Sequence, residues 1–324
     1  AIFTNQTKVT AAAALTSGHL AIVASYEDDA VQIINLRDVV DEGPQAHLNL
    51  TAAGTGGAAS MLERDRYPLD GAIAVDVFYV QEAGQQFSGV AIADTKRHIP
   101  YAIVAGHLSD GIQILSLRDP LNTTGTGPTA GQAGRSGGLH APYNGTGVSP
   151  YANTTDAATS RVTGYNLLNG VMDVATWNTT NTQPYAIVVS NLDDAMIIID
   201  LKDPTTLIGK QLFNSTDSNY FTALDGANSV ETFKMGDRFY ALITANATNA
   251  SGVTLVDLYE PSRPIPVDTI FDEQADDISG KTFNKLDLVN GIATFYHDGA
   301  HYAIAASSNQ IKGGDGDNGF QVIK

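Results

Sequence analysis

Three acidic residues stand at comparable positions in separate apolar segments of this sequence. Each segment opens with an Asp-Gly or Asn-Gly pair, and Asp76, Asp173 and Glu231 follow the first member of their pair by six, four and six residues. Even spacing places such residues on one face of a strand. One acid, one base or nucleophile and one carboxylate that tunes their pKa can together hydrolyse a glycosidic bond. Alternatively, these side chains line a wet channel or face cross-strand partners, without a catalytic role.

A second group of oxygen ligands lies in residues 313–319, GGDGDNG. Asp315, Asp317 and Asn318 alternate with glycines as in half of a calcium loop, but the bidentate Glu expected further along is absent. The segment also coincides with the turn of a repeated hairpin, so turn formation is the alternative explanation. Cysteine is absent, and the histidines show no metal-ligand spacing. We therefore predict no cofactor, with Ca²⁺ as the alternative.

The candidate residues belong to a hairpin pattern that recurs five times along the chain. The clearest copy, YAIVAGHLSDGIQILSLRDP at 101–120, has two apolar strands joined by Ser-Asp-Gly and ended by proline, which has no N–H to give a sheet. The other copies are residues 19–39, 184–204, 239–261 and 301–324. Most copies have a further apolar segment upstream, and several have one downstream. A repeated unit of four strands predicts an all-β fold, the β-propeller.

We predict one β-propeller domain over residues 1–324, with five blades of four antiparallel strands; six blades are the alternative. Residues 121–166 are rich in Gly and Thr and lack apolar periodicity, so we expect an inserted surface loop. The fifth hairpin copy lacks a fourth strand. We expect residues 1–7, AIFTNQT, to complete that last blade, in the same chain or, alternatively, in a neighbouring subunit, which would build a head-to-tail filament.

The charge and the acceptor sequences of the chain bear on its surroundings. A formal net charge of −17 argues against binding to nucleic acid and to anionic membrane surfaces, and no apolar stretch is long enough to span a membrane. The sequence Asn-x-Ser/Thr occurs nine times, more often than the composition alone would give. The acceptors are Asn5, Asn49, Asn122, Asn144, Asn153, Asn178, Asn214, Asn246 and Asn249. They favour a secreted or surface-displayed glycoprotein, although Thr- and Asn-rich loops alone also generate such sequences.

The hairpin copies at 101–120 and 185–204 resemble the LVIVD repeat, a family of β-propeller blades found largely in surface and secreted proteins. The resemblance covers the five hairpin segments, under half of the chain, and implies the propeller fold. It implies no activity, because the family has no shared catalytic motif. The chain departs from the family in its longer period and in the large Gly- and Thr-rich segment.

We therefore predict that this chain is not an enzyme but an extracellular protein with a structural or adhesive role. The predicted partners are covalent N-glycans and further copies of the same chain, with no nucleic acid and no membrane span. Two alternatives remain open. One is a carbohydrate-active hydrolase that uses Asp76, Asp173 and Glu231, and the other is a calcium-assisted, lectin-like binding module.

Overall fold

The structure is a computed structural model of the chain. It describes residues 2–4, 19–27, 30–35, 46–51, 71–82, 97–108, 110–116, 168–179, 183–202, 208–214, 224–247, 251–275, 280, 282–307 and 319–324. These residues form antiparallel strands and turns and no helix, which confirms the predicted all-β class. Two compact units can be distinguished, and each is described by itself. The first comprises Ala1–Asn153, Asn181–Pro184 and Leu201–Leu207, and the second comprises Thr154–Thr180, Tyr185–Asp200 and Ile208–Lys324.

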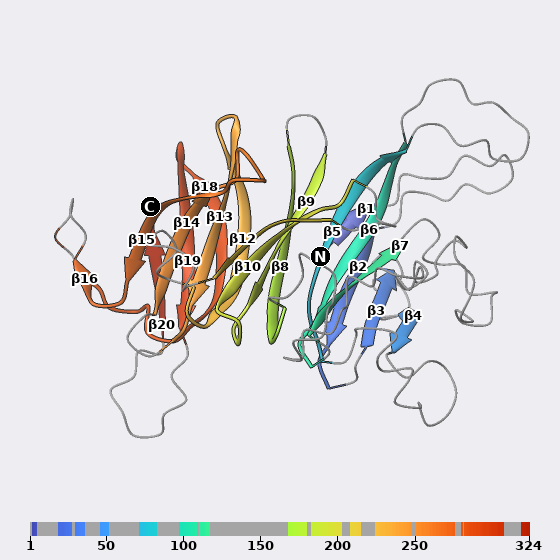
Figure 1. Cartoon of the computed structure of the whole chain (residues 1–324), viewed down its shortest axis with the longest axis horizontal. Coiled ribbons are helices and arrows are strands. Elements are labelled where there is room, and N and C mark those ends of the chain that lie inside the picture. The colour runs from blue at the N-terminus through green and yellow to red at the C-terminus, as the bar shows by residue number, and fades with distance from the viewer. Residues whose placement is uncertain are drawn as a thin grey trace, which may run out of the picture. The chain divides into compact units, whose positions relative to one another are not determined.

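The first unit contains two sheets (Figure 1). The four strands of the first sheet, in order, are β1 (Ile2–Thr4), β2 (His19–Ser25), β3 (Ala30–Asn35) and β4 (Ala46–Thr51). The three strands of the second sheet are β5 (Ala72–Glu82), β6 (Arg97–Gly106) and β7 (Gly111–Ser116). In both sheets, strands that are neighbours in sequence are neighbours in space, as in a β-meander.

The second unit contains three larger sheets and a small ribbon. The first sheet is formed by β8 (Val171–Asn178), β9 (Pro184–Ser190), β10 (Ala195–Asp200) and β11 (Ile208–Asn214). The next is formed by β12 (Ala227–Met235), β13 (Arg238–Ala245), β14 (Gly252–Asp257) and β15 (Ile265–Phe271). The last is formed by β18 (Val289–His297), β19 (Ala300–Ser307) and β20 (Gly319–Ile323). The ribbon, which the sequence did not suggest, pairs β16 (Gln274–Ala275) with β17 (Thr282–Phe283).

The predicted hairpin is confirmed in all five copies, as β2–β3, β6–β7, β9–β10, β13–β14 and β19–β20. In the clearest copy the strands pair up to Gly106 and Gly111. Asp110 in the turn between them has a φ of 49°, and Asp194 in the corresponding turn of the next copy has a φ of 51°. Aspartate tolerates this left-handed conformation better than most residues, which explains the acidic turns of the repeat.

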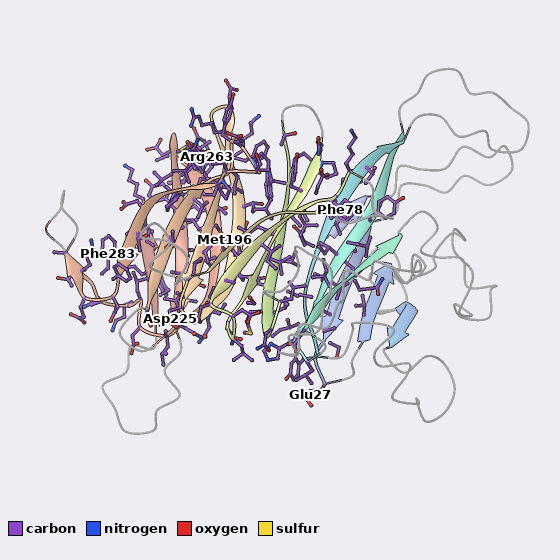
Figure 2. The ribbon with its side chains drawn as sticks, viewed as in Figure 1. Glu27, Phe78, Met196, Asp225, Arg263 and Phe283 are labelled. Carbon is purple, nitrogen blue, oxygen red and sulfur yellow. The ribbon has the colours of Figure 1, made fainter. Side chains whose placement is uncertain are left out.

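Successive sheets of the second unit pack face to face. One core cluster joins side chains of β8–β10, including Met196 (Figure 2), to side chains of β12–β14. A second cluster joins the far face of that middle sheet, through Leu242, to Ala303 and Ala305 of β19. Every residue of β9 and β10 is buried, which matches the largely apolar sequence of these two strands.

The N-terminal segment is placed differently from our expectation. Ile2–Thr4 pairs with β2, with Phe3 opposite Leu20, and so forms the first strand of the first sheet. The described part of residues 1–7 therefore does not supply a fourth strand to the last sheet. An antiparallel partner lying close along the chain costs less loop-closure entropy than a distant one. Residues 121–166, the predicted surface loop, lie outside the described residues.

The glycines of the Asp-Gly and Asn-Gly pairs have a local explanation. Gly170 and Gly226 adopt φ values of 65° and 67°, and each accepts a hydrogen bond from the turn of its own sheet, from the N–H of Asn191 and of Asn246 respectively. A Cβ on Gly170 would lie 2.5 Å from the Asn191 Oδ1 atom. Only glycine combines this backbone conformation with so close an approach.

Candidate functional site

Asp173 on β8 connects two sheets. Its Oδ2 atom accepts hydrogen bonds from Ser229 Oγ and from the Val230 N–H, both at 2.9 Å, and its Oδ1 atom accepts the Val174 N–H at 2.8 Å. β8 and β12 are each the edge strand of their sheet, so their outer backbone groups have no partner strand. The half-buried carboxylate of Asp173 accepts one of these edge donors, the Val230 N–H, and so connects the two edge strands.

Glu231 lies on β12, one residue after the donor to Asp173. Strand alternation places it on the face of β12 that carries Phe233, and Phe233 packs against the cluster shared with the last sheet. Glu231 is half-buried. Asp173 and Glu231 therefore lie on neighbouring edge strands. A side chain on the Glu231 face of β12 can reach Asp173, because Ser229 lies on that face and donates a hydrogen bond to Asp173.

Asp76 lies on β5 in the first unit, so it is described separately from the other two candidate carboxylates. It is half-buried, and its Oδ1 atom accepts the N–H of Val77 at 2.7 Å. The same local contact occurs between Asp173 and Val174. The shared geometry shows that the two aspartates are held alike by their own strands.

A cross-strand aromatic pair escaped the sequence analysis. In four sheets an aromatic residue of the first strand stacks on the repeated tyrosine of the second, with ring centroids 5.2 to 5.7 Å apart. The pairs are Phe78–Tyr101, Trp177–Tyr185, Phe233–Tyr240 and Phe295–Tyr302. The available signal was the repeated Tyr-Ala of the hairpin together with an aromatic residue seven positions after the glycine in three of the four segments. Each candidate carboxylate precedes its aromatic residue by two or four positions, so the two share a face.

Acidic turn residues also connect neighbouring sheets. Asp194 Oδ1 accepts the Gly226 N–H at 2.8 Å, across the boundary between two sheets of the second unit. Burial raises the pKa of Asp225 above its ordinary value, and the charge of Asp194 and a hydrogen bond with it raise the pKa further. Within one sheet, Asp193 Oδ2 accepts the Asn169 N–H at 2.8 Å. These turns thus fix how the sheets stack, a role beyond forming the turn itself.

Several predicted sites fall outside the described residues. Among them are the calcium alternative at Asp315, Asp317 and Asn318 and most of the glycosylation acceptors. Of the acceptors whose side chains are described, Asn178 is exposed, and Asn246 is half-buried with its amide 3.5 Å from Asn290 Oδ1. In the described part of the chain, no three His, Asp or Glu side chains are grouped to hold a metal ion. No helix there is long and apolar enough to cross a membrane.

Comparisons with known proteins found similar structures only. No family model and no curated protein matches the sequence. A protein from Lactobacillus plantarum is 11% identical, with a TM-score of 0.44, over 90% of this chain and 61% of its own. An exo-β-1,3-galactanase from Clostridium thermocellum is 9% identical, with a TM-score of 0.40, over 99% and 62%. An exo-1,5-α-L-arabinanase from a bovine ruminal metagenomic library is 10% identical, with a TM-score of 0.39, over 94% and 88%. The chain thus spans less than two thirds of the first two proteins.

This comparison corrects our expectation of a non-enzymatic protein with a structural or adhesive role, and with it the filament. Similar structures with a stated activity include a galactanase, an arabinanase, galactosidases and a fructofuranosidase, which are glycoside hydrolases. The predicted role was wrong because the repeated hairpin indicates the fold and carries no information about activity. At these identities and TM-scores the likeness concerns the fold alone, so any activity has to be argued from the residues of this chain.

Proposed function

We propose that this chain is a carbohydrate-active hydrolase whose working carboxylates include Asp173 and Glu231. The observation that carries the proposal is the bond from the Val230 N–H to Asp173 Oδ2. This hydrogen bond joins Asp173 of β8 to Val230 of β12, and Glu231 directly follows Val230. Glycosidases need two carboxyl groups of different character near one bond, and these two groups have different surroundings.

The surroundings suggest which group takes which role. Asp173 accepts hydrogen bonds from Val174, Ser229 and Val230 and is thereby held in one orientation, so we assign it the role of base or nucleophile. Glu231 belongs to a face that includes Phe233 and Leu242 of the apolar cluster, and we assign it the transfer of a proton to the leaving oxygen. Asp76 remains the third candidate carboxylate.

The finer features of the architecture also stay proposals. We infer five blades, since each of the five hairpin copies builds one sheet. Secretion and N-glycosylation are proposed from the acceptor sequences, and self-association remains a prediction. The resemblance to the LVIVD repeat and the calcium alternative likewise remain predictions.

The proposal is tested by assaying the purified chain on galactan, arabinan, xylan and a set of aryl glycosides. We expect the wild type to release reducing sugar from at least one of them. Glu231→Gln should lower kcat by about 10³-fold, in the range of a lost proton donor, with an unchanged midpoint of thermal unfolding. No hydrolysis of any substrate by the wild type, or full activity of Glu231→Gln, would refute the proposal.

Asp173 needs a control for stability, because it also connects two sheets. Asp173→Asn keeps the shape of the side chain, and we expect it to lose activity while the chain stays folded. Asp268→Asn is the matched control, since the exposed Asp268 accepts only the neighbouring Thr269 N–H among the hydrogen bonds described. Asp268→Asn should retain wild-type activity. A loss of activity in Asp173→Asn that follows its loss of folded protein would instead assign Asp173 a purely structural role.

A further inference from the structure

One position of the repeat departs from its pattern in a single copy. The residue after the leucine that follows the third strand is basic in the first three copies, as Arg37, Arg118 and Lys202. In the fourth copy it is Tyr259. The positions are equivalent, because Leu258 donates its N–H to Phe239 O at 2.9 Å, as Leu201 donates to Pro184 O at 3.0 Å. The fold therefore accepts a flexible cation here and does not require the tyrosine.

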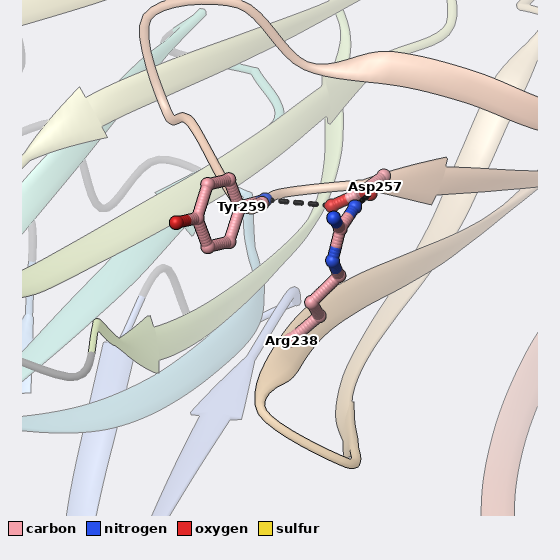
Figure 3. Close-up of polar contacts among 3 residues, drawn as sticks. All are labelled: Arg238, Asp257 and Tyr259. Atoms are coloured by element: carbon pink, nitrogen blue, oxygen red, sulfur yellow. Dashed lines mark hydrogen bonds and ion pairs between the residues drawn. The ribbon is translucent and has the colours of Figure 1, made fainter.

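Tyr259 is both exposed and held in place. Its side chain is 68% exposed, the largest value among the exposed large hydrophobic residues that the structure describes. The Arg238 guanidinium lies over the ring, 4.9 Å from its centroid. Arg238 Nη1 lies 2.6 Å from Asp257 Oδ2, while Asp257 Oδ1 accepts the Tyr259 N–H at 2.8 Å (Figure 3). These contacts form a closed triangle, so the ring is ordered before any ligand arrives and a ligand pays little ordering entropy.

The turn after Tyr259 adds polar groups of several kinds. Ser262 Oγ donates to Glu260 Oε1 at 3.2 Å, and the Arg263 N–H donates to Glu260 O at 2.8 Å. All three side chains are exposed. Figure 2 shows Arg263 and Asp225 at opposite ends of the sheets of the second unit. An exposed aromatic ring is thus followed by a carboxylate, a hydroxyl and a guanidinium, at the end of the sheets opposite to the acidic turns.

We propose that Tyr259, held by Arg238 and Asp257, is a platform that binds a pyranose ring of a glycan. The C–H bonds of a pyranose form an apolar face that packs on an aromatic ring, while its equatorial hydroxyls meet hydrogen-bonding groups at the rim. Tyrosine suits such amphipathic contacts. The platform follows β14, two strands away from β12, so it is a binding site separate from Asp173 and Glu231. This inference rests on the proposed hydrolase function and adds to it a second site that binds the polysaccharide substrate.

The test is affinity electrophoresis of the whole chain in gels that contain soluble galactan, xylan or arabinan. We expect galactan or xylan, which are built of pyranose rings, to retard the wild type. Tyr259→Lys places the basic residue of the other copies at this position, so it should fold normally. We expect it to weaken the binding about tenfold, consistent with the loss of one aromatic contact. Tyr259→Phe keeps the ring and should keep the binding, and arabinan, built of furanose rings, should not distinguish the variants.

The outcomes separate this platform from the proposed hydrolase. Glu231→Gln should be retarded like the wild type, and Tyr259→Lys should hydrolyse a small aryl glycoside like the wild type. If the retardation depends on Tyr259 but the wild type hydrolyses no substrate, the proposed hydrolase function is refuted and the proposed glycan-binding platform is supported. Equal retardation of the wild type and Tyr259→Lys, or no retardation by either pyranose polymer, would overturn the proposal that Tyr259 binds a glycan. A protein partner would then be the remaining explanation for the exposed ring.

Discussion

Trp177 and Phe295 hold the same place in two sheets of the second unit, yet they differ widely in burial. Each stacks on the repeated tyrosine of the neighbouring strand, with ring centroids 5.5 and 5.2 Å apart. Trp177 is 4% exposed and Phe295 is 40% exposed. The middle sheet, β12–β15, covers the face that carries Trp177, whereas among the described residues of this unit no further sheet follows β18–β20.

The difference in burial between Trp177 and Phe295 distinguishes two contributions to the stability of a sheet. The aromatic pair is built by two adjacent strands alone, and such a pair contributes about 0.5–1.5 kcal/mol. Burial under the next sheet removes apolar area from water and contributes about 1.5–3 kcal/mol more for a large side chain. Sheets of one repeated sequence are therefore held with unequal strength, depending on what covers them.

The largest expected effect is that of truncating the two aromatic residues. Trp177→Ala should lower the free energy of unfolding by about 3–5 kcal/mol, because it leaves a cavity between two sheets. Phe295→Ala should lower it by about 1 kcal/mol, since the ring is already partly in water. Urea unfolding followed by circular dichroism measures both, because Trp177 is the only tryptophan and its fluorescence is lost in the variant.

Trp177→Phe is the matched control for that comparison. The indole Nε1 atom of Trp177 is buried without a hydrogen-bond partner in the described structure, so phenylalanine removes an unpaired donor along with some volume. We expect a cost clearly below that of Trp177→Ala. Equal costs for Trp177→Ala and Phe295→Ala would contradict the comparison and would mean that Phe295 is covered as deeply as Trp177.

A smaller effect is expected at two glycines of the second unit, one directly before β12 and one within β18. A Cβ on Gly226, whose φ is 67°, would lie 2.6 Å from Asn246 Oδ1 and 3.0 Å from the backbone nitrogen of Ala247. Gly291 lies within β18, at the place that Ser229 holds in the middle sheet; it has no positive φ, and nothing lies within 4 Å of its Cβ position. Gly226→Ala should therefore cost about 2 kcal/mol, and Gly291→Ala should be neutral or slightly stabilising.

The same urea titration measures both glycine variants. A cost of Gly291→Ala as large as that of Gly226→Ala would show that the last sheet is packed as closely as the others at this end. The pair of variants thus extends the comparison from the covered faces of the sheets to the region where their first strands begin.

The features that could be predicted from the sequence are the local ones. The hairpins follow from two apolar strands and a turn whose Asp110 accepts the left-handed conformation, so a short window contains all the necessary information. The upstream strands were identified from their Asp-Gly and Asn-Gly pairs. The contact of Gly170 with the turn of its own sheet supplies the physical reason for that motif.

The candidate site could be predicted less well, because its geometry depends on how separate sheets stack. That Asp173 bonds to Ser229 and Val230 follows from the register between two edge strands, and no pattern within either strand encodes that register. For Tyr259 the departure from the repeat was visible, but its contacts with Arg238 and Asp257 depend on the pairing of β13 with β14, which places residues far apart in sequence side by side. The N-terminal strand was misplaced because our prediction started from the missing fourth strand of the fifth hairpin copy and not from the nearness of residues 2–4 to β2.

The smallest expected effect concerns Asp225, which lies at the boundary between two sheets of the second unit. The pKa of Asp225 is raised by burial and by Asp194 of the neighbouring sheet. A carboxyl group with a raised pKa in the folded state stabilises the fold below its ordinary value of 3.8, and this contribution is lost as the pH rises through the raised pKa. Asp225→Asn should therefore raise the unfolding midpoint at pH 7, and the gain should disappear at pH 3. Because Asp225 is largely exposed, solvent screening keeps the effect small, and thermal unfolding at both pH values measures it. A gain that is equal at pH 3 and pH 7 would show that charge repulsion across the boundary between the sheets is not its cause.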